Sequence, residues 1–213
     1  MRSEEAFLEQ AIYAGEQLPV MEAFYTLQGE GAHQGKAAYF IRLAGCDVGC
    51  HWCDVRESWQ QEGHPVFTVE EIAEKAAANP ARLAVITGGE PLMHNLAKLT
   101  ALLHKYGFII NIETSGSSPL SGELDWICLS PKKFKNPLPE AYEKANELKI
   151  IVFNEHDFRW AEEEAAKVNP NCLLLLQPEW GRQEKMLPRI IEYVKQNPKW
   201  RVSLQTHKFM QIP

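Results

Sequence analysis

Three cysteines, Cys46, Cys50 and Cys53, follow one another at CxxxCxxC spacing in one short segment. Three thiolates at this spacing can converge on one metal centre, and thiolates are the soft ligands that select iron–sulfur clusters or zinc. A closed zinc site needs four protein ligands, so it would add His51 or a remote residue. A 4Fe-4S cluster can be held by three cysteines, which leaves its fourth iron open to a small chelating molecule. The spacing therefore indicates either a catalytic 4Fe-4S cluster or a structural Cys3His zinc loop, and it favours both over a disulfide.

The length and charge of the chain limit its class. Its 213 residues suffice for one domain with a sizeable core, and no internal repeat is visible. The net charge of −6 and the pI near 5.7 argue against direct binding to nucleic acid or to a membrane surface, since either needs a clustered basic footprint. A small-molecule substrate fits this composition better.

Targeting signals are not visible in the sequence. Residues 1–5 lack the basic-then-apolar pattern of a secretory signal, and no apolar run approaches the length of a transmembrane helix. We therefore expect a cytoplasmic protein. Cys128 and Cys172 each lie in an apolar run, which predicts two buried free thiols.

A strand must present the cysteine segment. The apolar run at residues 38–43 leads into it, and Arg42 within that run needs a partner or a polar cavity. Before this strand, a weakly helical pattern over residues 4–16 predicts a short peripheral helix that Pro19 stops, and the glycines of residues 26–31 predict an exposed turn.

Apolar runs alternate with helical patterns in the rest of the chain, which is typical of βα units and a mostly parallel sheet. Strands are predicted at residues 83–86, 108–112, 126–129, 148–153, 172–176 and 201–204. Helices are predicted from the capping-box pattern at residues 68–71 to Asn79, and at residues 95–106, 157–167 and 187–196.

Polar side chains stand at or just after the end of almost every predicted strand. They are Arg42 with the cysteines, and residues 87–90, 113–115, 130–132, 177–179 and 205–208. In parallel α/β folds this edge of the sheet binds ligands. The chain is short for eight βα units, so the predicted fold is α/β, an incomplete TIM-like barrel of about six or seven mostly parallel strands with one site.

The cysteine motif followed by Thr87-Gly88-Gly89-Glu90-Pro91 resembles the radical S-adenosylmethionine (SAM) superfamily. The resemblance implies a radical SAM core whose cysteines hold three irons of a 4Fe-4S cluster, while the amino and carboxylate groups of SAM chelate the fourth. It also implies that an external one-electron donor supplies the electron that cleaves SAM to methionine and a 5′-deoxyadenosyl radical. Taken alone, residues 87–91 would also fit a plain strand-to-helix turn.

Four further segments narrow the resemblance to the 7-carboxy-7-deazaguanine synthases. The segments are residues 26–31, 113–116, 130–132 and 205–208, in that family's order along nearly the whole chain. The resemblance implies conversion of 6-carboxy-5,6,7,8-tetrahydropterin to 7-carboxy-7-deazaguanine with loss of ammonia. This is a step toward queuosine, a tRNA modification, and related deazapurines. It further implies a homodimer and Mg²⁺ dependence.

Residue roles follow from the matching positions of that family. The resemblance implies substrate contacts by Leu27, Gln28, Gly29, Glu30, Arg42, Thr87, Glu113, His207 and Pro213. It implies SAM contacts by Trp52, Cys53, Asp54, Gly88, Gly89, Glu90, Ser130, Pro131, Lys132, Gln177, Pro178, Glu179 and Trp180. We expect one domain over residues 1–213, with residues 1–20 peripheral and residues 205–213 closing the substrate site.

The chemistry of these side chains suits a pterin and SAM. Gln28 can pair with the amide-like edge of a pterin, and Arg42 can bind its carboxylate, bidentately where geometry allows. The positive charge of Lys132 can interact favourably with the carboxylate of SAM. The family often has Thr, as an Mg²⁺ ligand, where this chain has Val55, whose side chain offers no oxygen.

Two alternatives remain at this stage. One is another radical SAM enzyme, such as an activase that generates glycyl radicals, which would need a protein partner. The other is a zinc-stabilised binding module without enzymatic activity. The segments at residues 28–31 and 205–208 favour the synthase over the other radical SAM enzyme. The colour of the protein would separate the zinc module, because Zn²⁺ is redox-silent whereas an iron–sulfur protein is brown.

Overall fold

The computed structural model describes residues 4–213, and residues 1–3 of the expected peripheral segment lie outside the described residues. One sheet runs through the described chain. Its strands are β1 (Gln17–Leu27), β2 (Ala37–Leu43), β3 (Val66–Thr68), β4 (Leu83–Gly88), β5 (Ile109–Thr114), β6 (Trp126–Leu129), β7 (Glu147–Val152), β8 (Leu173–Pro178) and β9 (Trp200–Val202). Their order across the sheet is β3-β1-β2-β4-β5-β6-β7-β8-β9.

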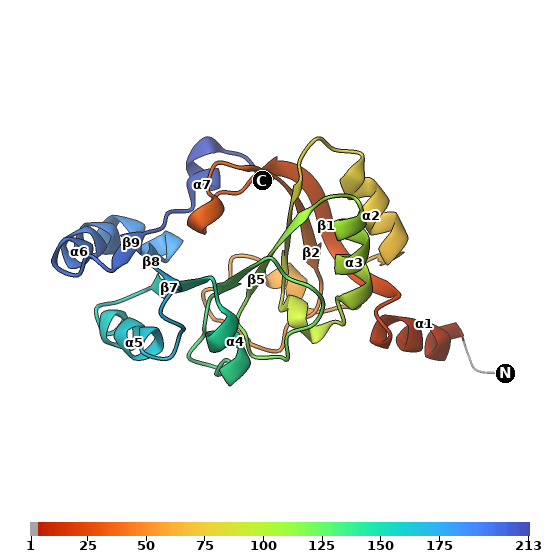
Figure 1. The fold of residues 1–213 in the computed structure, drawn as a ribbon. Helices are drawn as coiled ribbons and strands as arrows, with labels where there is room; N and C mark the ends of the chain where they lie inside the picture. Colours follow the sequence, from red (N-terminus) through yellow and green to blue (C-terminus); the bar gives the residue numbers. More distant parts are fainter. Residues whose placement is uncertain (1–3) are drawn as a thin grey trace.

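The seven strands from β2 through β4 to β9 are parallel, and β1 pairs antiparallel with both β2 and β3. The two end strands, β3 and β9, do not pair with each other, so the sheet curves without closing (Figure 1). This arrangement confirms the predicted α/β fold, an incomplete TIM-like barrel of mostly parallel strands.

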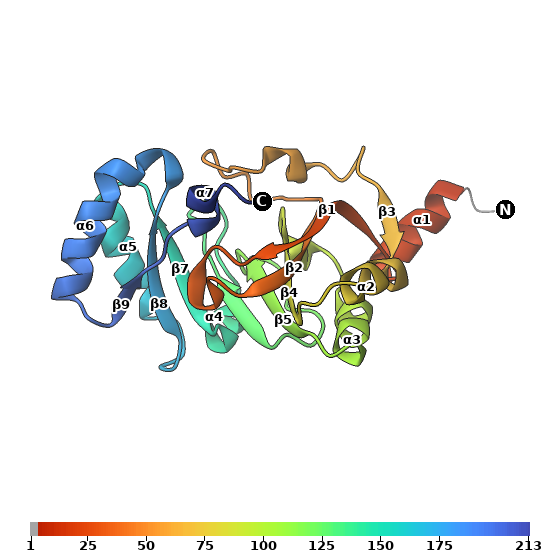
Figure 2. The same ribbon diagram turned by 90° about the horizontal axis from the view of Figure 1, so that it is seen from above.

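Helices cover the outer side of the sheet (Figure 2). They are α1 (Glu4–Tyr13), α2 (Val69–Ala77), α3 (Ala97–Lys105), α4 (Pro139–Lys144), α5 (His156–Ala165) and α6 (Gln183–Gln196). The short helix α7 (Thr206–Met210) instead lies against the loop that follows β1. Two apolar cores result: α2 and α3 pack on strands β1 to β5, whereas α4, α5 and α6 pack on strands β6 to β9. None of the helices in residues 4–213 combines the length and apolarity needed to cross a membrane.

Alternation along the parallel strands separates the cores from the site, because successive side chains of a strand point to opposite faces. In β7, Leu148 and Ile150 are buried in the helix-side core. Glu147 and Lys149 alternate with them and point to the inner face. In the same way, Arg42 lies between the core residues Ile41 and Leu43 of β2. The inner face of the barrel therefore carries the charged side chains.

The N-terminal region differs from the prediction. The expected helix is present as α1, but the residues after it form the long strand β1 instead of continuing a peripheral segment to residue 20. Leu18 and Val20 are buried in the first core. Pro19 obscured this strand because proline usually marks an edge or an interruption. Here Pro19 stands opposite Val66 of the short edge strand β3, and its carbonyl accepts a hydrogen bond from Ala44 N at 2.9 Å, so its missing N–H is tolerated. The sequence also did not reveal β3.

The C-terminal half contains three differences in element bounds. Helix α6 begins at Gln183, one turn earlier than predicted, because Met186 in its first turns is buried in the second core. Pro188 consequently lies inside the helix. Helix α4 was not predicted, and residues 206–210 form the short helix α7 after a last strand that ends at Val202.

Candidate active site

A pocket of about 500 Å³ lies at the carboxyl ends of the parallel strands. Its lining includes every residue expected to contact the cluster, SAM or substrate except Pro131, which is buried behind it. Side chains from both halves of the barrel meet there, from Arg42 on β2 to Gln177 on β8. The structure thus brings together in one cavity residues that the sequence placed at separate strand ends.

The cysteine loop is held by backbone hydrogen bonds at its start. Gly45 N donates to Ser58 O at 2.7 Å, and Cys46 N donates to Trp59 O at 3.0 Å. From the other side, Glu90 N donates to Gly45 O at 2.8 Å. These contacts fix where the loop leaves β2. Cys128 and Cys172 are buried and form no disulfide, as the sequence predicted.

The three loop thiols suit a multi-iron cluster better than one zinc ion. Tetrahedral zinc, with Zn–S bonds of about 2.3 Å, brings its sulfurs to within about 4 Å of one another. Among the described residues, the three loop cysteines do not form a group whose ligand atoms all lie within 4.8 Å of one another. Burial raises the pKa of the Cys46 and Cys50 thiols, so a cation is needed to favour their thiolate forms.

Aromatic side chains pack beside the cysteine loop. The ring of Trp52 stacks on Phe153 with centroids 5.9 Å apart, and Phe134 packs at 5.2 Å from the same indole. His51 packs edge-on against Trp52 at 4.4 Å. His51 therefore belongs to an aromatic cluster, which accounts for its place in the motif without a metal-ligand role.

The segment after β4 is shaped by close backbone approach. Gly88 has φ of +135°, and a Cβ there would lie 2.0 Å from Leu43 O. A Cβ at Gly89 would lie 2.2 Å from Gly45 O. Only glycine permits this contact between the end of β4 and the cysteine loop.

Glu90 has a different environment from the one expected of a SAM ligand. Its carboxylate lines the pocket but is buried, and it accepts hydrogen bonds from Leu92 N, Thr114 Oγ1 and Ser115 N at 3.1, 2.5 and 2.8 Å. Glu90 therefore joins the end of β4 to the end of β5. Ser115 was expected only as a polar strand end, and its part in this join required the tertiary structure.

Lys132 lies near the cysteine loop, as expected. Its ammonium donates to Ser130 Oγ at 2.8 Å, and burial lowers its pKa. A negatively charged ligand group beside Lys132 would favour its charged form and so offset the effect of burial on its pKa.

Lys149 was not predicted from the sequence, yet it is central to the site. Its ammonium, with the side chain only 5% exposed, lies 2.5 Å from Glu30 Oε2 and 2.8 Å from Glu113 Oε2. Burial lowers the pKa of Lys149, but the charges of the nearby carboxylates Glu113 and Glu30 outweigh it and raise the pKa well above its usual range. A lysine that alternates with apolar residues in a strand is the sequence signal that could have identified it.

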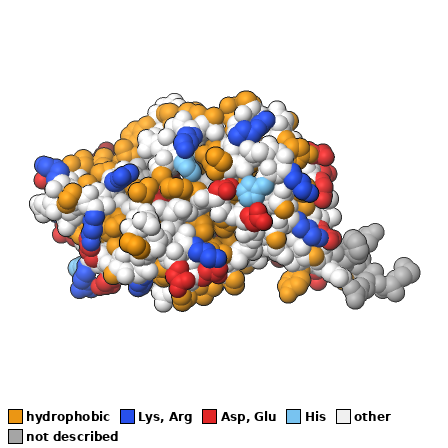
Figure 3. All heavy atoms as spheres, in the orientation of Figure 1, with side chains coloured by type: hydrophobic (Ala, Val, Ile, Leu, Met, Phe, Trp, Pro, Cys, Tyr) orange, Lys and Arg blue, Asp and Glu red, His pale blue; other side chains and the backbone are white. Residues whose placement is uncertain are grey.

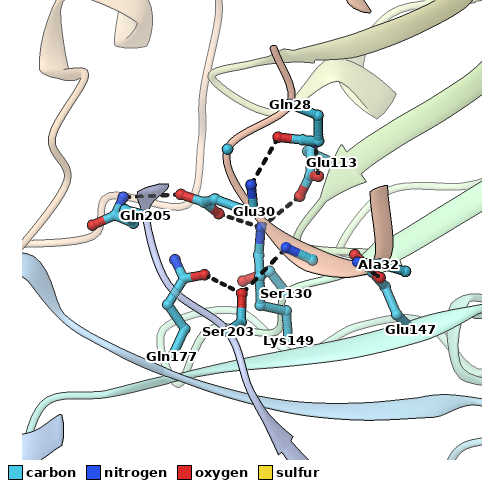
Figure 4. A network of polar contacts seen from close by, with 12 residues as sticks. Gln28, Glu30, Ala32, Glu113, Ser130, Glu147, Lys149, Gln177, Ser203 and Gln205 are labelled. Atoms are coloured by element: carbon cyan, nitrogen blue, oxygen red, sulfur yellow. Dashed lines mark hydrogen bonds and ion pairs between the residues drawn. The ribbon is translucent and has the colours of Figure 1, made fainter. Parts of the chain in front are cut away.

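The loop between β1 and β2 reaches over these strand ends (Figure 4). Gln28 Nε2 donates to Glu113 Oε1 at 3.1 Å, and Glu30 N donates to Gln28 Oε1 at 3.1 Å. Gln205 Nε2 donates to Glu30 Oε1 at 2.9 Å. The loop is therefore tied to β5, to β7 and to the segment before α7.

Helix α7 packs against the same loop (Figures 1 and 2). Thr206 donates to Gly29 O from its backbone N at 2.9 Å and from Oγ1 at 2.8 Å. A Cβ on Gly29 would lie 2.3 Å from His207 Nδ1, so glycine is required there. Burial lowers the pKa of His207, and Pro213 also lines the pocket, with its carbonyl 3.4 Å from Thr26 Oγ1.

Arg42 has both of the environments that the sequence suggested for it, an ion-pair partner and a polar cavity. It lines the pocket, and its Nε donates to Glu22 Oε1 of β1 at 2.6 Å. Thr87 stands beside it in the parallel register of β2 and β4. Because only Nε is engaged with Glu22, the two terminal nitrogens of the guanidinium can bind an anionic ligand.

Asp54 offers the one side-chain carboxylate next to Val55. Its Oδ2 accepts from Lys208 Nζ at 3.0 Å and from Gln205 Nε2 at 3.4 Å. The cation that this carboxylate meets in the described structure is therefore the Lys208 ammonium.

The end of β8 and the two residues after it, together residues 177–180, form another wall of the pocket. Gln177 Oε1 accepts from Ser203 Oγ at 2.7 Å, and Ser203 Oγ accepts from Gly31 N at 3.2 Å. Trp180 packs edge-on against Phe209 of α7 with centroids 5.5 Å apart.

Beneath the pocket, Glu113, Cys128 and Glu147 have ligand atoms within 4.8 Å of one another. Burial raises the pKa of Cys128 and of Glu147, which favours their neutral forms. Ala32 N donates to Glu147 Oε2 at 2.8 Å. Lys149 already supplies the positive charge beside Glu113, so this group is explained without a metal ion.

The space-filling view shows how charge is distributed over one face of the molecule (Figure 3). On the described part of that face, acidic and basic side chains are interspersed, with hydrophobic atoms between them. This pattern agrees with the composition, which argued against an extended basic surface.

Comparisons with known proteins agree with this geometry. Residues 40–151 match the model of the radical SAM superfamily. The chain is 57% identical to a 7-carboxy-7-deazaguanine synthase from Flavobacterium psychrophilum, over 95% of this chain and 96% of the relative. It is 48% identical to the synthase from Synechocystis, over 91% and 93% of the two chains. A crystal structure of QueE from Escherichia coli superimposes with a TM-score of 0.82 at 33% identity and covers 96% of this chain and 99% of that one.

Proposed function

The chain belongs to the 7-carboxy-7-deazaguanine synthases of the radical SAM superfamily, and from this premise we infer that it converts 6-carboxy-5,6,7,8-tetrahydropterin to 7-carboxy-7-deazaguanine with release of ammonia. This reaction is a step toward queuosine and related deazapurines. The observation that carries the inference is a single cavity lined both by the three loop cysteines and by the Gln28, Arg42 and His207 side chains.

The residues present fit a 4Fe-4S cluster and SAM. Cys46, Cys50 and Cys53 would hold the cluster, and Gly88 and Gly89 let the end of β4 pack directly against the cysteine loop. When bound, the cluster and SAM supply the 5′-deoxyadenosyl radical that abstracts hydrogen from the substrate. Lys132 would face the carboxylate of SAM, where its charge offsets that anion.

The protein's own contribution is to bind, orient and shield the substrate. Arg42 would hold the 6-carboxylate with the guanidinium nitrogens that Glu22 leaves free. Helix α7, with His207, and the loop at residues 28–30 would cover the substrate, because they meet at the mouth of the pocket. Such a cover excludes water and other quenchers of the radical.

Mg²⁺ fits this chain less well than the other cofactors. Mg²⁺ takes oxygen ligands in near-octahedral geometry. Val55 offers none from its side chain, and the Asp54 carboxylate is engaged by Lys208 and Gln205. Stimulation by added Mg²⁺ is therefore expected to be weak.

The reaction needs an external one-electron donor as well as the pterin substrate. We infer a cytoplasmic homodimer without direct binding to nucleic acid. This inference follows from the family resemblance and from the acidic composition, with its net charge of −6.

Anaerobic reconstitution with iron and sulfide tests the proposal. The brown protein would be incubated with SAM, a reductant and 6-carboxytetrahydropterin, and the products would be analysed by mass spectrometry. We expect 7-carboxy-7-deazaguanine to form without stoichiometric consumption of SAM, since SAM acts catalytically.

Two other outcomes would contradict it in different ways. A brown protein that cleaves SAM but leaves the pterin unchanged would retain the superfamily and exclude this substrate, as expected of a glycyl-radical activase. A colourless protein that binds zinc would exclude both, because Zn²⁺ is d¹⁰ and redox-silent.

A further inference from the structure

Lys149 bridges two carboxylates at the floor of the pocket. Figure 4 shows its ammonium between Glu30, which comes from the loop after β1, and Glu113, which comes from β5. The two N···O distances are 2.5 and 2.8 Å. The residues are separated by 119 and 36 positions in the sequence, so the tertiary fold alone creates this contact.

The hydrogen-bonding capacity of this group is not exhausted by the protein. An ammonium carries three N–H donors, and within residues 4–213 its hydrogen-bond partners are the two carboxylates. A carboxylate has about four acceptor sites, and Glu113 receives donors from Gln28, Asn111 and Lys149. One N–H donor of Lys149 therefore remains. Lys149 and Glu113, whose carboxylate also borders the Cys128 thiol, both line the pocket.

A pterin presents the complementary groups at one edge. Its pyrimidine ring carries a 2-amino group and N3–H as donors, and next to them the 4-oxo oxygen as an acceptor. A buried carboxylate beside an ammonium matches that edge, and groups of this kind discriminate strongly because a wrong ligand leaves them unpaired.

Resting on the proposed function, we propose that Lys149 and Glu113 select the 2-amino-4-oxo ring of the substrate. Glu113 accepts a hydrogen bond from the donor part of that edge, and Lys149 donates its third N–H to the 4-oxo oxygen. Glu30 holds Lys149 from the opposite side and thereby positions the ammonium.

The arrangement of the strands agrees with this assignment. Across the sheet, β5 with Glu113 lies between β2 with Arg42 and β7 with Lys149. A pterin whose 6-carboxylate meets Arg42 would therefore direct its opposite end toward Glu113 and Lys149. The reaction leaves the 2-amino-4-oxo ring intact, so the contact binds substrate and transition state alike and acts on KM more than on kcat.

Calorimetric binding to the reconstituted enzyme with SAM and without reductant tests this inference. The two ligands are 6-carboxypterin and its 2,4-diamino counterpart, in which an amino group replaces the 4-oxo oxygen. We expect the wild-type enzyme to prefer the 4-oxo ligand by about tenfold or more. Lys149→Met should reduce this preference to within about threefold and should raise KM with little change in kcat.

The variants are chosen to separate an effect on ligand preference from an effect on folding. Lys149→Met leaves two buried carboxylates without a cation, so the double variant Lys149→Met/Glu30→Gln, which removes one of those charges, gives the same measurement in a less strained background. Lys98→Met is the matched control, since Lys98 pairs with Glu16 at 2.6 Å on the surface. It should keep the wild-type preference.

Three results would overturn the inference. A preference for the 4-oxo ligand that persists in both Lys149 variants would show that another group reads the oxygen. An affinity loss confined to ligands with a 6-carboxylate, judged against pterin itself, would place the ammonium at the carboxylate. If the wild-type enzyme neither binds 6-carboxypterin nor converts the tetrahydropterin, the proposed function fails as well, whereas normal turnover with unchanged preference rejects this inference alone.

Discussion

Arg42 contributes one guanidinium nitrogen to an ion pair within the fold and leaves the others for the ligand. Its Nε is engaged by Glu22 at 2.6 Å, and its side chain is 19% exposed at the pocket. We predict that Arg42→Ala raises KM for the pterin by about 10- to 100-fold, because a charge-assisted hydrogen bond contributes about 1.5–3 kcal/mol. Steady-state kinetics, together with the iron content of the protein, measures this effect.

Glu22→Gln is the control for Arg42. It removes the ion-pair partner and leaves the guanidinium in place, so KM should change far less than in Arg42→Ala. Equal turnover of wild type and Arg42→Ala at low substrate concentration would refute the role of Arg42 in substrate binding.

We expect Val55 to limit the response of the enzyme to Mg²⁺. Since its side chain lacks oxygen, we predict that Mg²⁺ stimulates the wild-type enzyme less than it stimulates Val55→Thr, in which a hydroxyl can ligate the ion. Initial rates with and without Mg²⁺, after treatment with a chelator, provide the measurement. Strong and equal stimulation of both proteins would mean that another ligand has taken over.

At the scale of elements, the join between the β1–β2 loop and α7 depends on one glycine. A Cβ on Gly29 would lie 2.3 Å from His207 Nδ1 and 2.7 Å from His207 Cβ. Gly29→Ala should therefore displace α7 from the mouth of the pocket and lower kcat/KM by about tenfold or more, because water exclusion and substrate orientation suffer. The free energy of unfolding should change by less than about 1 kcal/mol, since the loop lies outside both cores.

Gly35→Ala is the comparison for this prediction. Gly35 lies in the same loop with φ of +82°, but a Cβ there meets nothing within 4 Å. Gly29 itself does not have a positive φ, so Gly35→Ala adds backbone strain without the collision, and its kcat/KM should stay near the wild-type value. Wild-type activity of Gly29→Ala would show that the position of α7 does not limit the reaction.

For the whole molecule, the buried charges around Lys149 link stability to pH. Burial raises the pKa of Glu30, but the Lys149 charge and hydrogen bonds from Lys149, Gln205 and Gln177 outweigh it and lower the pKa from 4.5 to about 2. The ionised form is thus favoured in the folded state. Its stabilisation, about 3 kcal/mol, is complete above pH 4.5 and is lost as the pH falls toward 2.

Urea unfolding of the cluster-free chain tests this dependence. The difference in unfolding free energy between wild type and Glu30→Gln should shrink by about 1 kcal/mol between about pH 6 and pH 3.5. A difference that stays constant over this range would show that Glu30 has an ordinary pKa in the folded chain.

The local features of the site could be predicted from the sequence. The spacing of Cys46, Cys50 and Cys53 indicated the metal centre, and apolar runs followed by polar residues placed one site at the strand ends. These features depend on neighbours within a few residues and on the two-residue period of a strand, which a sequence displays directly. The bounds of β1 and α7 were missed, because packing and not local propensity decides them.

Only the tertiary structure determined which charges meet. Lys149 and Glu30 are 119 residues apart, and Glu90 joins two strand ends through Thr114 and Ser115. Such contacts depend on the order and the curvature of the sheet, which bring distant strands to one edge. The sequence by itself therefore determined the class of chemistry and the edge of the sheet where it takes place. The three-dimensional fold decided how buried charges are paired there, because a buried ion pair forms only where folding has brought both partners out of water together.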